Sequence, residues 1–407
     1  MLCRHCSTSL RQTFLDLGFA PPSNAYLDEQ DLVRPETYFP LRVMVCDQCW
    51  LVQTQDYTDA EHLFDDSYAY FSSVSQSWLD HAERYTDMIV DRLKLTANSK
   101  VVEIASNDGY LLKNFLSRGI PCLGVEPTSS TAVPARELGI PVVEEFFGVD
   151  LAHELVQREG KADLIIGNNV FAHVPDINDF TQGLMVLLES GGTITLEFPH
   201  LMRLLEQNQF DTVYHEHFSY LSLGAVNHIL AAAKLRLFDV EELSTHGGSL
   251  RVYACHQSDP RNVNPAVAHT LTSERQAGME DLSCYRDFQQ RADSVKNALL
   301  EFLIGQKRDS KTVVAYGAAA KGNTLLNYAG IKPDLIKYVC DGAASKQGKY
   351  MPGSHIPIHP PSMLEQDVPN VILILPWNIA DEIKAVAKAR VPEDCSFVTA
   401  IPRLRTL

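Results

Sequence analysis

Long apolar runs are absent from this 407-residue chain, and none approaches the ~20 residues that a membrane-spanning helix needs. Basic residues are also scarce, with 35 Lys and Arg against 51 Asp and Glu, which gives a net charge of −16. Such an acidic balance disfavours a surface for nucleic acid or for anionic lipid. We therefore expect neither a membrane nor a nucleic acid as a partner.

The chain also lacks internal repeats, low-complexity tracts and the apolar h-region of a secretory signal at its start. We therefore expect its nine cysteines to be reduced thiols in the cytoplasm. The apolar fraction of 45% indicates real hydrophobic cores, and the length predicts two or three domains.

Four of the nine cysteines form two closely spaced pairs, Cys3-x-x-Cys6 and Cys46-x-x-Cys49. Each pair can bind one edge of a tetrahedral metal ion, and zinc is the usual metal at four thiolates. A redox pair, which needs only one such motif, and scattered buried thiols are the alternatives. Four protein ligands leave no open coordination position, so we predict a structural zinc. His5, between two of the ligands, is expected to be a solvated neighbour.

The segment over residues 101–112 has the pattern of a cofactor-binding turn. Its first residues predict a buried strand, the small and polar residues a tight turn, and the Leu pair the start of a helix. Glu126 ends the next strand-like run, 23 positions after Glu103, where an acid can accept bonds from both ribose hydroxyls. Glu103 and Asp108 repel phosphate but suit an amine and a sulfonium, so we predict S-adenosylmethionine (SAM) rather than a dinucleotide. The alternative is an ordinary turn with Asp108 as a helix cap.

The following segments continue the alternation of strand and helix. The segment over residues 161–176 predicts a strand that ends in polar residues, residues 180–188 a helix, and residues 193–197 another strand. The order βαβαβαβ is that of a SAM-dependent methyltransferase domain with a doubly wound sheet. The candidate cofactor-binding residues are Glu103, Ser106, Asn107, Gly109, Glu126, Asn168 and Asn169.

Four titratable or hydrogen-bonding side chains follow one another at Tyr214, His215, Glu216 and His217. His can act as a base near neutral pH, Tyr can donate to a developing oxyanion, and Glu can hold an imidazole in one tautomer. The set suits proton abstraction beside a carbonyl. A His-x-His metal pair and a polar surface turn are the alternatives. His173, just past a strand end at the expected cofactor edge, is a further candidate.

A second α/β unit is predicted toward the C-terminus. Residues 265–306 have helical spacing and few Gly or Pro, which predicts one long linking helix. Residues 312–327 repeat the strand, small-residue turn and helix, here with Lys321, which favours a phosphate group. An NAD site with Asp341 at a ribose, or a scaffold without ligand, are the alternatives. Further strands are expected at residues 335–339 and 371–375.

Taken together, these motifs resemble the sugar C-methyltransferases that act on nucleotide-linked deoxysugars, and the resemblance runs nearly end to end. The motifs are the paired Cys-x-x-Cys, Glu-Ile-x-Ser-Asn-Asp-Gly, Tyr-His-Glu-His, His246-Gly-Gly-Ser-Leu-Arg, Tyr316-Gly-Ala-Ala-Ala-Lys-Gly-Asn-Thr-Leu-Leu-Asn-Tyr, Lys346-Gln-Gly-Lys-Tyr-Met-Pro-Gly and Leu375-Pro-Trp-Asn. The chain departs from the family at Ala105, where Gly is common in the SAM turn, and at Ala343-Ala344, where Pro is common. We expect the first departure to narrow the cofactor pocket slightly and the second to affect only substrate fit.

The resemblance implies an α/β protein of three parts, with the sugar nucleotide between the last two. They are a zinc-binding module over residues 1–70, a Rossmann-like SAM domain over 71–257, and a C-terminal Rossmann-like domain with its linking helix over 258–407. Family members methylate the carbon next to a 4-keto group, here expected to be C3. The implied general base is His217, with Tyr214 and Glu216 as its partners, and His173 and Tyr68 match other active-site positions. The implied substrate-binding residues are Tyr68, Tyr70, Lys321, Gly322, Asn323 and Lys346.

Three competing functions stay open from the residues alone. An O- or N-methyltransferase could use the same histidine as a base, and a NAD-linked sugar-nucleotide dehydrogenase could use the C-terminal glycine turn. A zinc scaffold would have no catalysis at all. The sequence leaves the sugar, the nucleotide and the oligomeric state open, and a monomer is compatible with it.

Overall fold

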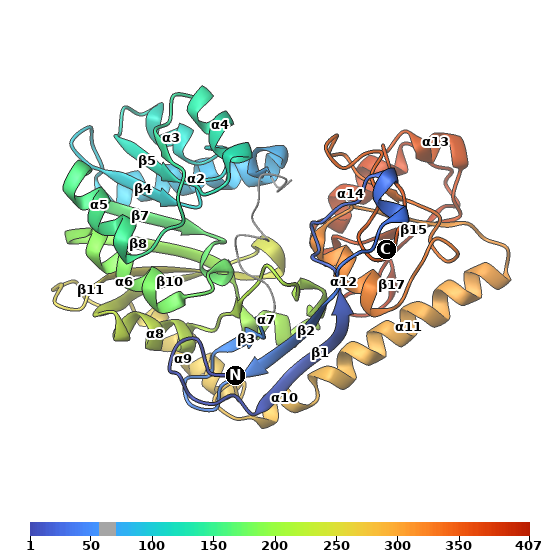
Figure 1. The fold of residues 1–407 in the computed structure, drawn as a ribbon, viewed down its shortest axis with the longest axis horizontal. Coiled ribbons are helices and arrows are strands. Elements are labelled where there is room, and N and C mark those ends of the chain that lie inside the picture. The colour runs from blue at the N-terminus through green and yellow to red at the C-terminus, as the bar shows by residue number, and fades with distance from the viewer. Residues whose placement is uncertain (57–70) are drawn as a thin grey trace.

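Three β-sheets and their helices make up the computed structural model, which describes residues 1–56 and 71–407 (Figure 1). The sheets have four, seven and six strands. The α/β fold class predicted from the sequence is confirmed. No helix in the described ranges is long and apolar enough to cross a membrane.

The four-stranded sheet is antiparallel and carries the paired cysteines at its edge. Its order is β1 (Gln12–Ala20), β2 (Phe39–Val45), β3 (Val52–Thr54) and β9 (Ser219–Tyr220). The last strand comes from the middle of the chain, so residues 1–70 do not complete this sheet by themselves. Between β1 and β2, residues 21–38 form an arm that lies on the C-terminal domain, where Leu27 pairs with Tyr350 (Figure 1).

The seven-stranded sheet has the order β10-β11-β8-β7-β4-β5-β6. Strands β4 to β8 are parallel, while β11 runs antiparallel to both β8 and β10. All four residues of β4 are buried, as expected for a parallel strand covered by helices on both faces. The strand order reverses between β4 and β7, which is where such sheets bind ligands. The strands are β4 (Val101–Ile104), β5 (Cys122–Val125), β6 (Val142–Val143), β7 (Ala162–Asn168), β8 (Leu188–Pro199), β10 (Leu235–Leu243) and β11 (Ser249–His256).

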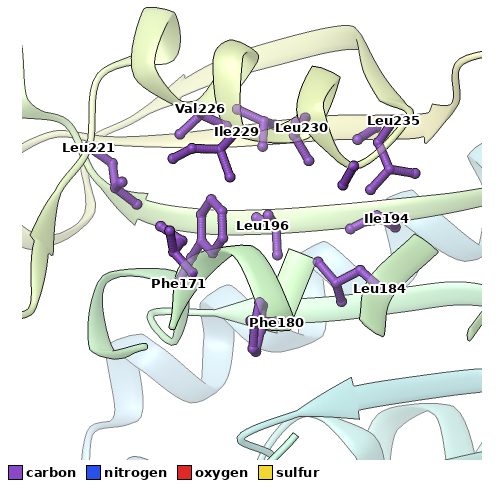
Figure 2. Packing of buried hydrophobic residues seen from close by; sticks show 14 of the residues in the cluster. Phe171, Phe180, Leu184, Ile194, Leu196, Leu221, Val226, Ile229, Leu230 and Leu235 are labelled. Atoms are coloured by element: carbon purple, nitrogen blue, oxygen red, sulfur yellow. The ribbon is translucent and has the colours of Figure 1, made fainter. Parts of the chain in front are cut away.

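Helices cover both faces of this sheet, and β8 lies in its core. In Figure 2, Ile194 and Leu196 of β8 lie between Leu184 of one helix and Ile229 and Leu230 of another. The helices of this part of the chain are α2 (Gln76–Leu93), α3 (Leu112–Leu116), α4 (Ser129–Glu137), α5 (Val149–Glu159), α6 (Ile177–Leu187), α7 (Leu201–Glu206) and α8 (Leu223–Ala232).

The C-terminal sheet has the order β14-β13-β12-β15-β16-β17, and only β17 is antiparallel to its neighbour. Its strand order also reverses, between β12 and β15. The strands are β12 (Val313–Tyr316), β13 (Val339–Cys340), β14 (Ile358–His359), β15 (Val371–Ile374), β16 (Ser396–Thr399) and β17 (Arg405–Thr406), and the helices are α12 (Ala320–Tyr328), α13 (Met363–Asp367) and α14 (Ala380–Lys388). The strand expected over 335–339 is limited to Val339–Cys340.

The single linking helix expected over 265–306 is wrong. The segment forms α9 (Pro265–Gln276), α10 (Ser283–Arg286) and α11 (Phe288–Arg308). Gly278 ends the first helix in a left-handed conformation, with φ +80°. The hydroxyl of the buried Tyr285 then donates to the carbonyl of Met279, which fixes the turn.

Candidate active site

A cavity of about 730 Å³ opens at the carboxyl ends of β4 and β7 and extends to the start of α12. Its size is within the range of small-molecule sites. Three parts of the chain line it: Asn24 comes from the arm, most of the wall from the central domain, and Ala319, Ala320, Lys321 and Lys346 from the C-terminal domain.

The cofactor end of the cavity is lined by Asn107, Glu126, Asn168 and Asn169, with Trp78 as an aromatic wall. The Glu126 carboxylate accepts the backbone N–H of Asn107 (2.9 Å) and that of Thr128 (3.1 Å), one on each oxygen. Each oxygen retains a second lone pair for a ligand hydroxyl. Burial raises the pKa of Glu126, and these two N–H groups oppose the rise.

Side-chain oxygens of the two asparagines have no hydrogen-bond partner in the described part of the chain. The Oδ1 atoms of Asn168 and Asn169 are buried and accept no hydrogen bond from the described residues. Buried oxygens without partners are costly, so they indicate a ligand with donor groups. The site therefore fits a cofactor with a ribose and an amine.

Three predicted cofactor residues lie behind the wall rather than on it. Glu103 is fully buried, and neither of its oxygens has a partner in the described chain. Burial, Glu126 and Asp108 raise its pKa well above the ordinary value. Ser106 is also fully buried, and Gly109 packs so closely that a Cβ would lie 2.5 Å from Ile140 Cδ1. Contacts of these three residues with a cofactor stay predictions.

Ala105, the departure in the SAM turn, lines the cavity with φ +56°. This left-handed conformation costs a residue with a Cβ about 1–2 kcal/mol. The strain gives a physical reason for the Gly that the family resemblance leads us to expect at this position.

The catalytic candidates His217, His173 and Tyr214 line the middle of the cavity. The ring centroids of His217 and Tyr214 are 4.0 Å apart, and those of His217 and His173 4.6 Å. His217 Nδ1 lies 2.8 Å from the carbonyl oxygen of Thr212, and His173 Nδ1 lies 2.7 Å from that of Glu216. A carbonyl only accepts, so Nδ1 carries the proton in both rings and the lone pair of each neutral ring is on Nε2.

Both rings are neutral at pH 7. Burial, aided by His173 and Lys321, holds the pKa of His217 well below its usual range. Burial also lowers the pKa of His173 to about 4. At neutral pH, Nε2 of His217 therefore carries its lone pair rather than a proton.

Glu216 lies behind these rings and does not orient His217, because Thr212 does. Its Oε1 accepts the side-chain amide of Asn24 (3.1 Å), and its Oε2 is buried without a partner among described residues. Burial raises the pKa of Glu216. His215 packs against Phe39 instead, with ring centroids 5.9 Å apart.

Two lysines lie at the far end of the cavity. Lys321 Nζ donates to Asn378 Oδ1 (2.8 Å) and lies 5.0 Å from the Trp377 ring centroid. Lys346 Nζ donates to the carbonyl of Ala318 (2.8 Å). Carboxylates at one end and ammonium groups at the other make the cavity electrostatically asymmetric.

Gly322 and Asn323 lie inside the C-terminal domain rather than on the cavity wall. A Cβ on Gly322 would lie 2.8 Å from Leu375 Cδ1, and Asn323 Nδ2 donates to the carbonyl of Ser23 (2.6 Å). Asp341 caps the turn, where it accepts the N–H groups of Ala318 (2.7 Å) and Ala343 (2.8 Å). Tyr68 and Tyr70 lie outside the described residues.

Several cavity residues were not among the predicted site residues, and His246 and Asn24 are two of them. His246 lies 3.3 Å (Nε2) from Asn169 Nδ2, and both residues have left-handed backbones, with φ +54° and +52°. Burial, followed by Lys321, lowers the pKa of His246 to about 4. The two glycines after His246 were its sequence signal, whereas nothing in the sequence indicated Asn24.

The four paired cysteines come together beside the four-stranded sheet. Their Sγ atoms all lie within 4.8 Å of one another, with Cys3 and Cys49 at 3.6 Å and Cys6 and Cys46 at 3.5 Å. A tetrahedral ion with Zn–S bonds of ~2.3 Å would place its sulfurs ~3.8 Å apart, so the residues fit zinc. Across the described ranges this is the one group of metal-ligating side chains, and neither His215 nor His217 belongs to one. His5 is held by Asn178 (2.8 Å) and is not merely solvated.

The fold and these two sites define a SAM-dependent methyltransferase with a zinc-binding module. Family models match three successive parts: a zinc binding domain (residues 3–64), a methyltransferase domain (75–240) and a C-methyltransferase C-terminal domain (244–402). The chain is 36% identical over 405 residues to the C-methyltransferase NovU of Streptomyces niveus, which covers 100% of this chain and 96% of the relative. The chain belongs to this family of C-methyltransferases. The acceptor is thus carbon, in place of the alternatives of oxygen, nitrogen and hydride transfer.

Two similar solved structures each cover less than half of the chain. A SAM-dependent methyltransferase from Anabaena variabilis is 16% identical, covers 43% of this chain and 85% of its own, and has a TM-score of 0.35. The magnesium protoporphyrin IX methyltransferase of Synechocystis is 17% identical, covers 42% and 82%, and has a TM-score of 0.33.

Proposed function

We propose that this C-methyltransferase methylates a nucleotide-diphosphate-linked 4-keto-deoxysugar at the carbon next to the keto group, C3. The observation that carries the proposal is the fixed tautomer of His217. Its Nδ1–H is bound by the Thr212 carbonyl, which leaves a lone pair on Nε2 of a ring that lines the cavity.

A carbon acceptor needs such a base, because a C–H bond has no lone pair with which to attack a methyl group. His217 Nε2 takes the proton from the carbon beside the keto group, and the C–H electrons become those of an enolate. General-base catalysis of this kind contributes roughly 10²–10⁴-fold. When bound, SAM supplies the electrophilic methyl group that this carbon accepts.

The enolate oxygen needs a donor, and Tyr214 is the residue that fits. Its ring lies against that of His217, and a phenol O–H can donate to an oxyanion. His173 does not suit this role in its neutral form, because its one N–H is already donated to Glu216. We assign His173 to the wall that holds the His217 ring, and Glu216 with Asn24 to the sugar side.

The diphosphate belongs at the lysine end of the cavity. Lys321 and Lys346 supply positive charge, and the first N–H groups of α12 have no partner within the helix. The ribose and sulfonium of the cofactor belong at the other end, beside Glu126. This arrangement places the sugar between the two, at His217.

The test replaces His217 with asparagine, which keeps a polar side chain but removes the base. We expect His217→Asn to bind both substrates, to lose methyl transfer by about 10²-fold or more, and to lose exchange of the substrate C3 proton in deuterated water with S-adenosylhomocysteine bound. His228→Asn, on the exposed face of α8, is the matched control and should retain activity. Near-full activity of His217→Asn, or a product whose new methyl group is not on the carbon beside the keto group, would refute the proposal.

A further inference from the structure

The first zinc-binding pair lies directly on the segment that follows His173. The side-chain amide of Asn178 donates to the carbonyls of Arg4 (3.2 Å) and His5 (2.8 Å). The loop between Cys3 and Cys6 is thereby seated on the methyltransferase domain, next to a wall of the cavity.

The Arg4 guanidinium connects this loop to both histidine segments. Nη1 donates to the carbonyl of Pro175 (2.6 Å), two residues after His173. Nη2 donates to the carbonyl of Thr54 (3.2 Å), and the guanidinium carbon lies 5.4 Å from the ring centroid of Phe218, which directly follows His217. The Arg4 side chain is only 6% exposed, so water does not compete strongly for these bonds.

Strand β3 supplies the second contact with the catalytic segment. The Thr54 hydroxyl donates to the carbonyl of His217 itself (3.2 Å), and the Thr54 N–H donates to that of Phe218 (3.1 Å). The strand then pairs with β9, which begins at Ser219. One side of the His217 backbone is thus built by the zinc-binding module.

Hydrogen bonds through Gln53 connect Arg4 to the zinc-binding cysteines. The Arg4 N–H donates to Gln53 Oε1 (2.9 Å), and Gln53 Nε2 lies 3.2 Å from Cys3 Sγ, where it donates to the sulfur. Gln53 is fully buried. A zinc ion on Cys3 and Cys6 would fix the residue that lies between them, and the guanidinium with it.

We propose that Arg4 is a positioning residue for methyl transfer, through which the zinc-binding loop holds the His173 and His217 segments in register. Arg4 acts on the two histidine segments through the Pro175 and Thr54 carbonyls and the Phe218 ring, and its Nη2 also forms an ion pair with Asp56 (2.8 Å). The inference rests on the proposed function, because it takes His217 as the base. Misplacing a reacting group by about 1 Å can cost ~10²-fold in rate, so a brace of this kind affects turnover more than substrate binding.

The test compares Arg4→Met with Arg42→Met in zinc-loaded full-length protein. Arg42 is on β2 of the four-stranded sheet, and its side chain binds the half-exposed Asp16 rather than either histidine segment. We expect Arg4→Met to keep one zinc per chain and an unchanged KM for SAM, while kcat and the C3-proton exchange rate both fall ~10²-fold. Arg42→Met should match the wild type.

Chemical rescue separates positioning from folding. In Arg4→Ala, added guanidinium chloride should restore part of kcat, whereas sodium chloride at the same ionic strength should not. Thr54→Val removes only the hydroxyl bonds to the carbonyls of His217 (3.2 Å) and Phe218 (3.4 Å). It serves if the Arg4 variants do not fold, and it should also lower kcat with KM unchanged.

Each remaining outcome decides against one proposal. Full activity of Arg4→Met or Thr54→Val beside an inactive His217→Asn overturns this inference alone. Zinc loss from Arg4→Met but not from Arg42→Met would make Arg4 a residue for metal retention and also overturns it. Full activity of His217→Asn overturns the proposed function instead.

Discussion

Replacing Glu126 with alanine should remove most of the hydrogen bonding to the cofactor ribose and so weaken SAM binding. The carboxylate is 5% exposed and already oriented by the N–H groups of Asn107 and Thr128, so its remaining lone pairs are fixed toward the cavity. Two charge-assisted bonds to ribose hydroxyls contribute ~2–3 kcal/mol in all. We therefore expect Glu126→Ala to raise the Kd for SAM by ~30- to 140-fold.

Calorimetric titration of SAM into the purified variant measures this directly. Glu126→Ala also leaves two backbone N–H groups without their acceptor, so its Tm should fall and must be measured beside the affinity. Glu137→Ala, at the exposed end of α4, is the matched control and should change neither. An unchanged Kd for SAM in a folded Glu126→Ala protein would refute the assignment of this carboxylate.

Two further predictions concern Lys321, at the opposite end of the cavity, and Glu103, behind its wall. Lys321→Met should raise the KM for the sugar nucleotide ~10-fold or more, since a charge-assisted bond contributes ~1.5–3 kcal/mol, and should leave the KM for SAM nearly unchanged; equal effects on both would contradict a separate phosphate site. Glu103→Gln should stabilise the ligand-free protein at pH 8, because burial raises the pKa of Glu103 well above 4.5 in the folded state. A carboxyl group whose pKa is raised by folding stabilises the folded state at a pH below its unfolded pKa, and this stabilisation is lost as the pH rises through its folded pKa. The stability advantage of Glu103→Gln over the wild type should therefore shrink as the pH is lowered toward 4.5. Denaturation curves at pH 5 and pH 8 that show the same difference would contradict this account of Glu103.

Local patterns in the sequence predicted several secondary structure elements and the zinc ligands. A run such as Val101–Ile104 predicts a buried parallel strand, and paired Cys-x-x-Cys motifs predict a four-thiolate site, because both depend on spacing within a few residues. The small-residue turns at 105–109 and 317–319 follow β4 and β12, the strands beside which the strand order reverses in the structure. These predictions agree with the strands and the cysteine cluster of the structure.

Which side chains of a motif face the cavity was decided only by the tertiary structure. In the turn after β4, Ala105 and Asn107 line the cavity, whereas Glu103, Ser106 and Gly109 lie behind its wall. The group that orients His217 is the backbone carbonyl of Thr212, which no residue type could have indicated.

The contribution of the zinc-binding module to the site is likewise a tertiary fact. Asn24, Arg4 and Thr54 reach Glu216, Pro175 and His217 across more than a hundred residues of sequence, in contacts that exist only after β3 pairs with β9. The sequence by itself indicated the paired metal ligands and buried strands such as β4, since neighbouring residues specify those, but not the division of residues 265–306 into three helices. The catalytic geometry was decided by the folded chain, because it depends on hydrogen bonds between segments that meet only when three sheets have packed together.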